Sequence, residues 1–207
     1  MEKVFDLVKE NEPIEGCTLS SVILKGVSVF SLGKDTDISA ESYPYEKLIH
    51  VLSGQIRIFS GKDEWMIMPG ESFAMKKEIA YGIQAMTESV YVETSGKDMV
   101  NETVKAGEVF DLNEKVPYRE GKIVNMDIMH TDHMKYAVMA FDAGTGLDEH
   151  AAPGDAIVNA LDGEGIIGYE GKEYVLKKGQ SFRFARGGRH YVRAEKRFRM
   201  SLTLTLE

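Results

Sequence analysis

The residues of this chain best suited to chemistry are two histidines, His150 and His190, which lie forty residues apart. An imidazole can ligate a metal ion or exchange a hydrogen bond through its ring nitrogens. Each histidine lies in a run of alternating residues typical of a strand. Strand side chains alternate faces, so both imidazoles face one interior if the two runs border it. The spacing therefore predicts a binding site in this part of the chain.

Neighbouring side chains leave two kinds of ligand open. Asp148 shares the face of His150 under strict alternation, which gives two imidazoles and one carboxylate, a set used by non-haem iron. Arg186 and Arg189 lie in the loop beside His190, where guanidinium groups favour a carboxylate or phosphate. We therefore expect a metal at His150, His190 and Asp148, or an anionic small molecule near the two arginines.

Small residues at inferred inward positions predict an open interior around the histidines. They are Ala152, Ala156, Ala160 and Ala194. A concave apolar pocket with a few polar groups is the usual form of a small-molecule site. The alternative is that large side chains fill this space, and those available are Phe182, Phe184, Tyr191 and Met200.

The elements that must position these residues belong to a tandem repeat. VFDL occurs at positions 4–7 and again at 109–112. Further on, Gly54 matches Gly163 and Gly70 matches Gly179, at a constant offset of 109 residues. A match this long and ordered indicates an internal duplication. We expect a first domain over 1–97, a linker over 98–107 and a second domain over 108–207.

Almost every segment has the pattern of a strand. Short Val, Ile, Tyr and Phe runs are separated by glycine turns, and two longer runs cover 19–32 and 123–141. Only 2–10 and the segment near 99–105 favour short helices. The pattern predicts an all-β protein built as a sandwich or small barrel.

The motif spacing resembles the cupin family, whose two motifs are G-x5-H-x-H-x3–4-E-x6-G and G-x5-P-x-G-x2-H-x3-N. The first motif falls on Gly144, His150, Ala152, Ala156 and Gly163. The second falls on Gly179, Ala185, Gly187, His190 and Ala194. The resemblance covers nearly the whole chain and implies two tandem cupin barrels, each a double-stranded β-helix or jelly roll.

The resemblance also implies a depleted metal site in the second barrel. Metal-binding cupins hold a divalent transition metal (iron, manganese, zinc or nickel) with three histidines and one glutamate. Here His150 and His190 are kept, whereas Ala152 and Ala156 stand where the second histidine and the glutamate would be. Alanine cannot ligate a metal, so two imidazoles are left.

In the first half, the resemblance places other residue types at the four ligand positions. They are Glu41, Tyr43, Lys47 and Tyr81. We expect Glu41 and Lys47 to form an internal salt bridge, with the two tyrosines as hydrogen-bond partners, and little free space. The alternative is a register that leaves both charges in solvent. Either arrangement predicts a structural role for this half.

Composition excludes several classes of partner. The net charge of −8 disfavours nucleic acid, where phosphate neutralisation supplies most of the binding. No stretch reaches the roughly 20 apolar residues of a membrane span. With the single Cys17 no internal disulfide can form, and we expect a cytoplasmic protein.

Three functions follow as hypotheses. The first is a small-molecule binding or sensing protein with its pocket in the second barrel. The second is a metal-dependent enzyme of isomerase or dioxygenase type that uses His150 and His190. The third is a structural protein without a ligand. For assembly we expect the two barrels to pair as an intramolecular pseudo-dimer, with a homodimer of the whole chain as the alternative.

Overall fold

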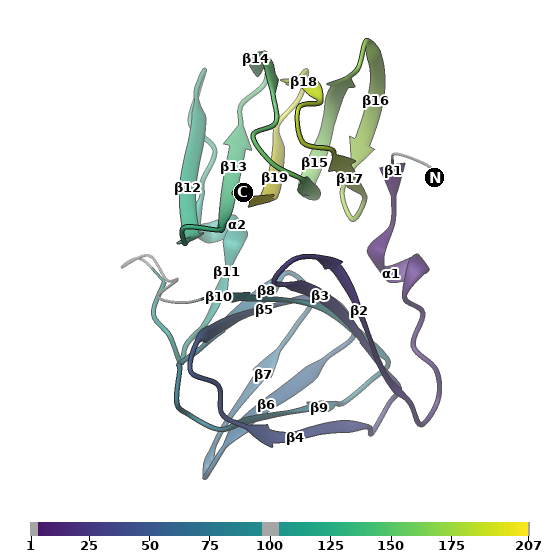
Figure 1. Cartoon of the computed structure of the whole chain (residues 1–207), viewed down its shortest axis with the longest axis vertical. Coiled ribbons are helices and arrows are strands. Elements are labelled where there is room, and N and C mark those ends of the chain that lie inside the picture. The colour runs from purple at the N-terminus through teal and green to yellow at the C-terminus, as the bar shows by residue number, and fades with distance from the viewer. Residues whose placement is uncertain (1–3, 97–103, 207) are drawn as a thin grey trace. The chain divides into compact units, whose positions relative to one another are not determined.

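The structure is a computed structural model, and it describes residues 4–96 and 104–206. Nearly all regular structure in these ranges is β, with two four-residue helices, α1 (Leu7–Glu10) and α2 (Leu112–Lys115). The all-β prediction is confirmed, because the branched and aromatic runs form strands between glycine turns. The described residues form two compact units, each built of strands (Figure 1).

The first unit contains two sheets. A six-stranded sheet has the order β11-β8-β5-β10-β3-β2, and a four-stranded sheet has the order β4-β9-β6-β7. Every pairing in both sheets is antiparallel. The strands are β2 (Thr18–Leu24), β3 (Val27–Leu32), β4 (Asp37–Glu41), β5 (Glu46–Ser53), β6 (Ile56–Ser60), β7 (Asp63–Ile67), β8 (Glu71–Met75), β9 (Tyr81–Ala85), β10 (Ser89–Gly96) and β11 (Val109–Asp111).

The second unit repeats this plan, but one long strand joins its two layers. One layer has the order β1-β17-β15-β19-β13-β12, while β14, β18 and β16 continue from the far end of β15. The strands are β1 (Val4–Phe5), β12 (Ile123–His130), β13 (Met134–Phe141), β14 (Thr145–Ala151), β15 (Ala156–Tyr169), β16 (Lys172–Lys177), β17 (Ser181–Phe184), β18 (Arg189–Ala194) and β19 (Phe198–Thr205). β15 therefore combines the roles of β5 and β6.

The boundaries of the units differ from the predicted division at 98–107. The second unit combines the described residues up to Leu7 with those from Asn113 onward, and the first unit runs from Val8 to Leu112. The reason is that β1 pairs with β17, whereas its repeat counterpart β11 pairs with β8. Each VFDL segment thus completes the unit formed by the other half of the sequence. Residues 98–103 of the predicted linker lie outside the described residues.

Matched glycines confirm the repeat in backbone geometry. Gly54 and Gly163 have φ of 75° and 72°, and Gly70 and Gly179 have φ of 90° and 85°. Residues with a Cβ rarely adopt this left-handed conformation, so these glycines define the same turns in both units. The two long runs are in fact hairpins, β2–β3 and β12–β13, rather than single strands.

Each unit has its own apolar core between its strands. In the first, Ile49, Val51 and Phe73 are fully buried. In the second, Phe182, Phe198 and Ile167 are fully buried. Across residues 4–96 and 104–206, neither helix has the length or apolar character that a membrane crossing requires.

Candidate functional site

The structure brings the two predicted histidines together. His150 on β14 and His190 on β18 are direct cross-strand partners, and their ring centroids lie 4.2 Å apart at an interplanar angle of 54°. His190 is buried with 9% exposure, whereas His150 is exposed. The prediction that both imidazoles meet at one point is therefore realised by the pairing register.

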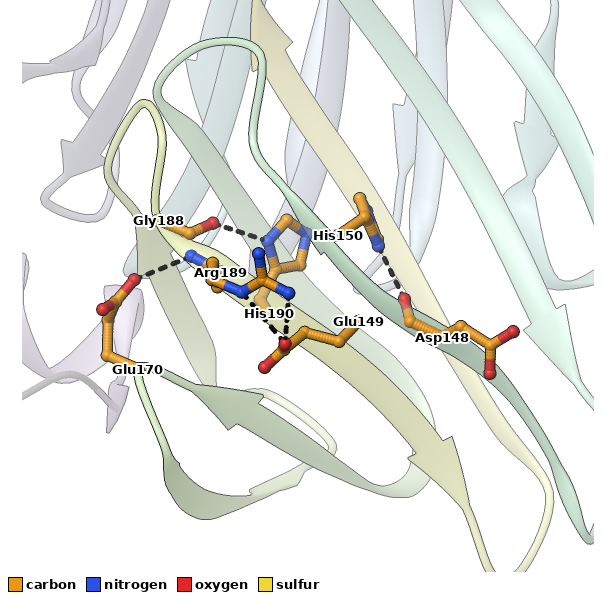
Figure 2. Close-up of polar contacts among 7 residues, drawn as sticks. All are labelled: Asp148, Glu149, His150, Glu170, Gly188, Arg189 and His190. Carbon is orange, nitrogen blue, oxygen red and sulfur yellow. Dashed lines mark hydrogen bonds and ion pairs between the residues drawn. The ribbon is translucent and has the colours of Figure 1, made fainter.

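Backbone carbonyls orient both rings (Figure 2). The Nδ1 atom of His150 lies 2.8 Å from the carbonyl oxygen of Asp148, and that of His190 lies 3.1 Å from the carbonyl oxygen of Gly188. Because a carbonyl only accepts, each Nδ1 carries the proton and each Nε2 keeps its lone pair. Burial lowers the pKa of His190, the Gly188 carbonyl opposes this, and the nearby His150 lowers the pKa further. Burial therefore favours the neutral imidazole at His190.

The carboxylate of Asp148 does not join the pair. The register shifts between Leu147 and His150, so Leu147 pairs with Val192 while His150, three residues on, pairs with His190. This bulge breaks the strict alternation from which the three-ligand set was predicted. Figure 2 shows the Asp148 carboxylate directed away from the imidazoles. In the part of the chain that the structure describes, no three His, Cys, Asp or Glu side chains gather into a metal site.

Of the two predicted arginines, Arg189 has its guanidinium paired with a carboxylate. Arg189 donates from two guanidinium nitrogens to one Glu149 oxygen, at 3.0 Å and 2.6 Å, and this ion pair raises the pKa of Arg189 (Figure 2). The guanidinium charge is therefore largely neutralised. Arg186 is exposed, and its backbone N–H donates to Asp155 at 2.9 Å.

Large side chains fill the space that the alanines were predicted to leave. Ala152 and Ala156 are buried with 4% and 2% exposure in one apolar cluster with Phe182 and Phe184. The Phe184 ring centroid lies 4.2 Å from that of His190. The interior is therefore filled at these positions, and the prediction of an open interior around the alanines is wrong.

The second unit has a hollow of about 430 Å³ whose lining includes Asp148, Glu149 and Tyr191 but neither histidine, and a smaller cavity lies in the first unit. It has a volume of about 160 Å³, and it lies between strands of both sheets of that unit. Its polar wall includes Glu41, Tyr43, Lys47, Tyr81, Tyr91 and Glu93. The first half therefore has the free space that the sequence predicted it to lack, because its inward tyrosine and lysine chains do not fill the interior.

The charges of this cavity are paired differently from the prediction. Lys47 is buried, and its Nζ lies 3.0 Å from Glu93 and 3.6 Å from the centroid of the Tyr43 ring. The Tyr43 hydroxyl donates to Glu41, and this bond is the largest of the causes that raise the pKa of Tyr43 to about 12. The predicted Glu41–Lys47 salt bridge is thus replaced by a Lys47–Glu93 pair and a Tyr43–Glu41 hydrogen bond.

Tyr91 differs from the other polar residues of the cavity wall in its hydrogen bonding. Its hydroxyl is buried and has no hydrogen-bond partner among the described residues. Burial raises its pKa well above the usual value, so the phenol stays protonated. The ring stacks on Phe30 at 5.0 Å. Sequence reasoning missed Tyr91 and Glu93, although at the repeat offset of 109 they match the apolar Met200 and Leu202.

Comparison with known proteins identifies the fold. A Cupin domain model matches residues 137–205. The solved structure of a Cupin 2 conserved barrel domain protein from Leptotrichia buccalis is 30% identical, with a TM-score of 0.88, and the match covers 99% of this chain and 98% of that one. The chain belongs to the cupin family. No curated protein matches its sequence.

More distant cupin structures share the fold alone. A salicylate 1,2-dioxygenase mutant from Pseudoaminobacter salicylatoxidans is 11% identical with a TM-score of 0.69, and the match covers 97% of this chain and 82% of that one. A putative glyoxylate induced protein from Pseudomonas aeruginosa is 14% identical with a TM-score of 0.61, covering 92% and 78%.

Within the cupin frame, the two candidate sites occupy equivalent places. Glu41 pairs with Tyr81 next to a register shift, as His150 pairs with His190. The cavity of the first unit therefore lies at the position where the family holds its metal, but with carboxylate, phenol and ammonium groups in its wall.

Proposed function

We propose that this cupin binds or senses a small molecule through the cavity of its first unit. The observation that carries the proposal is Tyr91, which lines the cavity and whose hydroxyl is buried and unpaired among the described residues. Buried polar atoms in native proteins nearly always have a partner, and each exception needs an explanation. A polar atom of a bound molecule supplies the missing partner. This proposal moves the site from the second half, where we expected it, to the first.

The histidine pair supports a metal-dependent function less well. Two anchored imidazoles with free Nε2 atoms are half of a metal site, since metal-ligating histidines commonly donate their other nitrogen to a carbonyl or carboxylate. However, catalytic zinc sites keep three protein ligands, and the Asp148 carboxylate does not supply the third. The residues do not fit the family's ligand set, so we derive no metal-dependent step. Metal analysis of the purified protein tests this: a stoichiometric metal that is lost in His150→Ala would restore the enzyme hypothesis.

The experiment for the proposed site uses a reciprocal pair of variants. At the repeat offset Met75 in the cavity wall matches Phe184 in the filled core of the second unit. Met75→Phe adds bulk to the wall and should narrow the cavity, whereas Phe184→Met, its control, alters the other unit. A set of small sugars, acids, phenols and amines is screened against all three proteins by ligand-observed NMR.

We expect at least one compound to bind the wild type and Phe184→Met but not Met75→Phe. If no compound depends on residue 75, the proposal fails and the structural hypothesis takes its place. Circular dichroism and the fluorescence of Trp65 check that Met75→Phe is folded, because Trp65 contacts Phe73 in the same core.

A further inference from the structure

The size of the first-unit cavity limits the molecule that it can hold. Its volume is about 160 Å³. An engineered apolar cavity of about 150 Å³ binds benzene, whereas sites for drug-sized molecules measure roughly 300–1,000 Å³. If the proposed function holds, the ligand is therefore about the size of one six-membered ring.

The charges of the cavity favour an uncharged ligand. The buried Lys47 and the half-buried Glu93 lie 3.0 Å apart and form an ion pair. Lys76 and Glu41 also line the cavity, but both are exposed to solvent. An ion placed beside this ion pair would lose part of its hydration without gaining an unpaired counter-ion from Lys47 or Glu93. Neither an anion nor a cation is matched by this wall.

The remaining wall combines apolar surface with one buried hydroxyl that has no partner among the described residues, and with the hydroxyl residues Ser39, Tyr45 and Tyr81. Phe30, Ile38, Met75 and Ile83 supply apolar contacts, and Tyr91 supplies a hydroxyl. Arg57 Nε is also buried and unpaired among the described residues, but Arg57 does not line the cavity. A neutral phenolic oxygen can donate one hydrogen bond and accept others. The wall therefore matches a ring that bears an oxygen atom directed at Tyr91.

We infer that the cavity takes a neutral, single-ring ligand with one hydroxyl or carbonyl oxygen, which bonds to the Tyr91 hydroxyl while the ring packs on the apolar wall. This inference rests on the proposed function and specifies its ligand class. It differs from the anionic ligand that the sequence suggested, because that expectation came from Arg186 and Arg189 in the other unit.

Four probes of one ring each test the class: phenol, toluene, benzoate and benzylammonium. They are titrated into isotope-labelled protein and followed by amide chemical shifts, which also locate the site. Phenol should bind about threefold to tenfold tighter than toluene, as one net hydrogen bond implies. The two ions should bind at least tenfold more weakly than phenol.

Two variants assign the oxygen contact. Tyr91→Phe should remove the preference for phenol over toluene while leaving toluene binding in place. Tyr191→Phe is the matched control, because Tyr191 donates to Glu173 on an exposed face of the other unit, and it should keep the preference. A preference that survives in Tyr91→Phe overturns the assignment, and Tyr91 would then bond to an ordered water only.

The outcomes separate this inference from the proposed function. Tightest binding by benzoate or benzylammonium overturns the neutral class but keeps the cavity as a site. The same holds if all four probes fail while another compound binds in a manner that depends on Met75. If nothing binds the cavity, both proposals fail.

Discussion

Acid should destabilise the first unit through His50, a histidine that the candidate site does not use. His50 lies on β5 with 8% exposure, and its Nδ1 is 2.9 Å from the Ser72 hydroxyl. Burial lowers its pKa from 6.5 to about 4, and Asp111 opposes the shift only in part. The folded protein therefore keeps this imidazole neutral at pH values where the unfolded chain protonates it.

The sign and size of this loss of stability follow from the linkage between proton binding and folding. Above pH 6.5 His50 is neutral in both the folded and the unfolded state, so its protonation takes nothing from the free energy of unfolding. Between pH 6.5 and 4 the unfolded state binds the extra proton, and stability falls as the pH falls. With these two pKa values the loss is about 2 kcal/mol at pH 5 and about 3 kcal/mol at pH 4.

The assay is urea unfolding followed by the fluorescence of Trp65, the single tryptophan of the chain, which packs against the core of the first unit. Other groups also titrate, so the wild type is compared with His50→Gln between pH 7 and pH 5. The free energy of unfolding should fall by about 2 kcal/mol more in the wild type than in the variant. The exposed His133 gives a control, His133→Gln, which should follow the wild type. Parallel curves for the wild type and His50→Gln would refute a depressed pKa.

Further predictions concern both units. Tyr91→Phe should stabilise the ligand-free protein by about 1 kcal/mol in urea unfolding, because it removes an unpaired buried hydroxyl; a loss of stability would mean that the hydroxyl has a partner. His190→Ala should cost about 2 kcal/mol by calorimetry, because the ring is buried, whereas the exposed His150→Ala should cost under about 0.5 kcal/mol. Gly163→Ala should lower the free energy of unfolding by at least about 3 kcal/mol, since the added Cβ would lie 2.1 Å from a backbone oxygen at a φ of 72°. Gly171 has open space around it, so Gly171→Ala is the control. Equal losses of stability in the two variants would contradict this reason. Light scattering at several concentrations tests assembly: a tetramer or larger would count against the expected pseudo-dimer.

Local signals made much of the fold predictable. Alternating residues and turn glycines determine structure over a few neighbouring positions, so strands and turns can be predicted from them. The sequence matches of Gly54 with Gly163 and of Gly70 with Gly179 correspond to similar φ angles in the structure. The choice of pairing partner is not local, which is why the exchange of β1 and β11 was missed.

The site was predictable only where register was regular. The meeting of His150 and His190 followed from strand pairing, whereas the bulge before His150 turned Asp148 away. The partner of Lys47 is Glu93 on β10, a strand that carries none of the family's motif positions. Comparing the halves residue by residue would have identified it, since a carboxylate stands where the other half has leucine.

The exchanged β1 and β11 bear on how this chain folds as it leaves the ribosome. Neither half of the sequence is self-sufficient, because each carries the edge strand of the other unit. The first unit is complete only after Val109–Asp111 has been synthesised, and β1 can pair only after Ser181 and Phe182 have been synthesised. A gene split between the two repeats would therefore yield two fragments, each with a missing strand and a surplus one, that become complete only when expressed together.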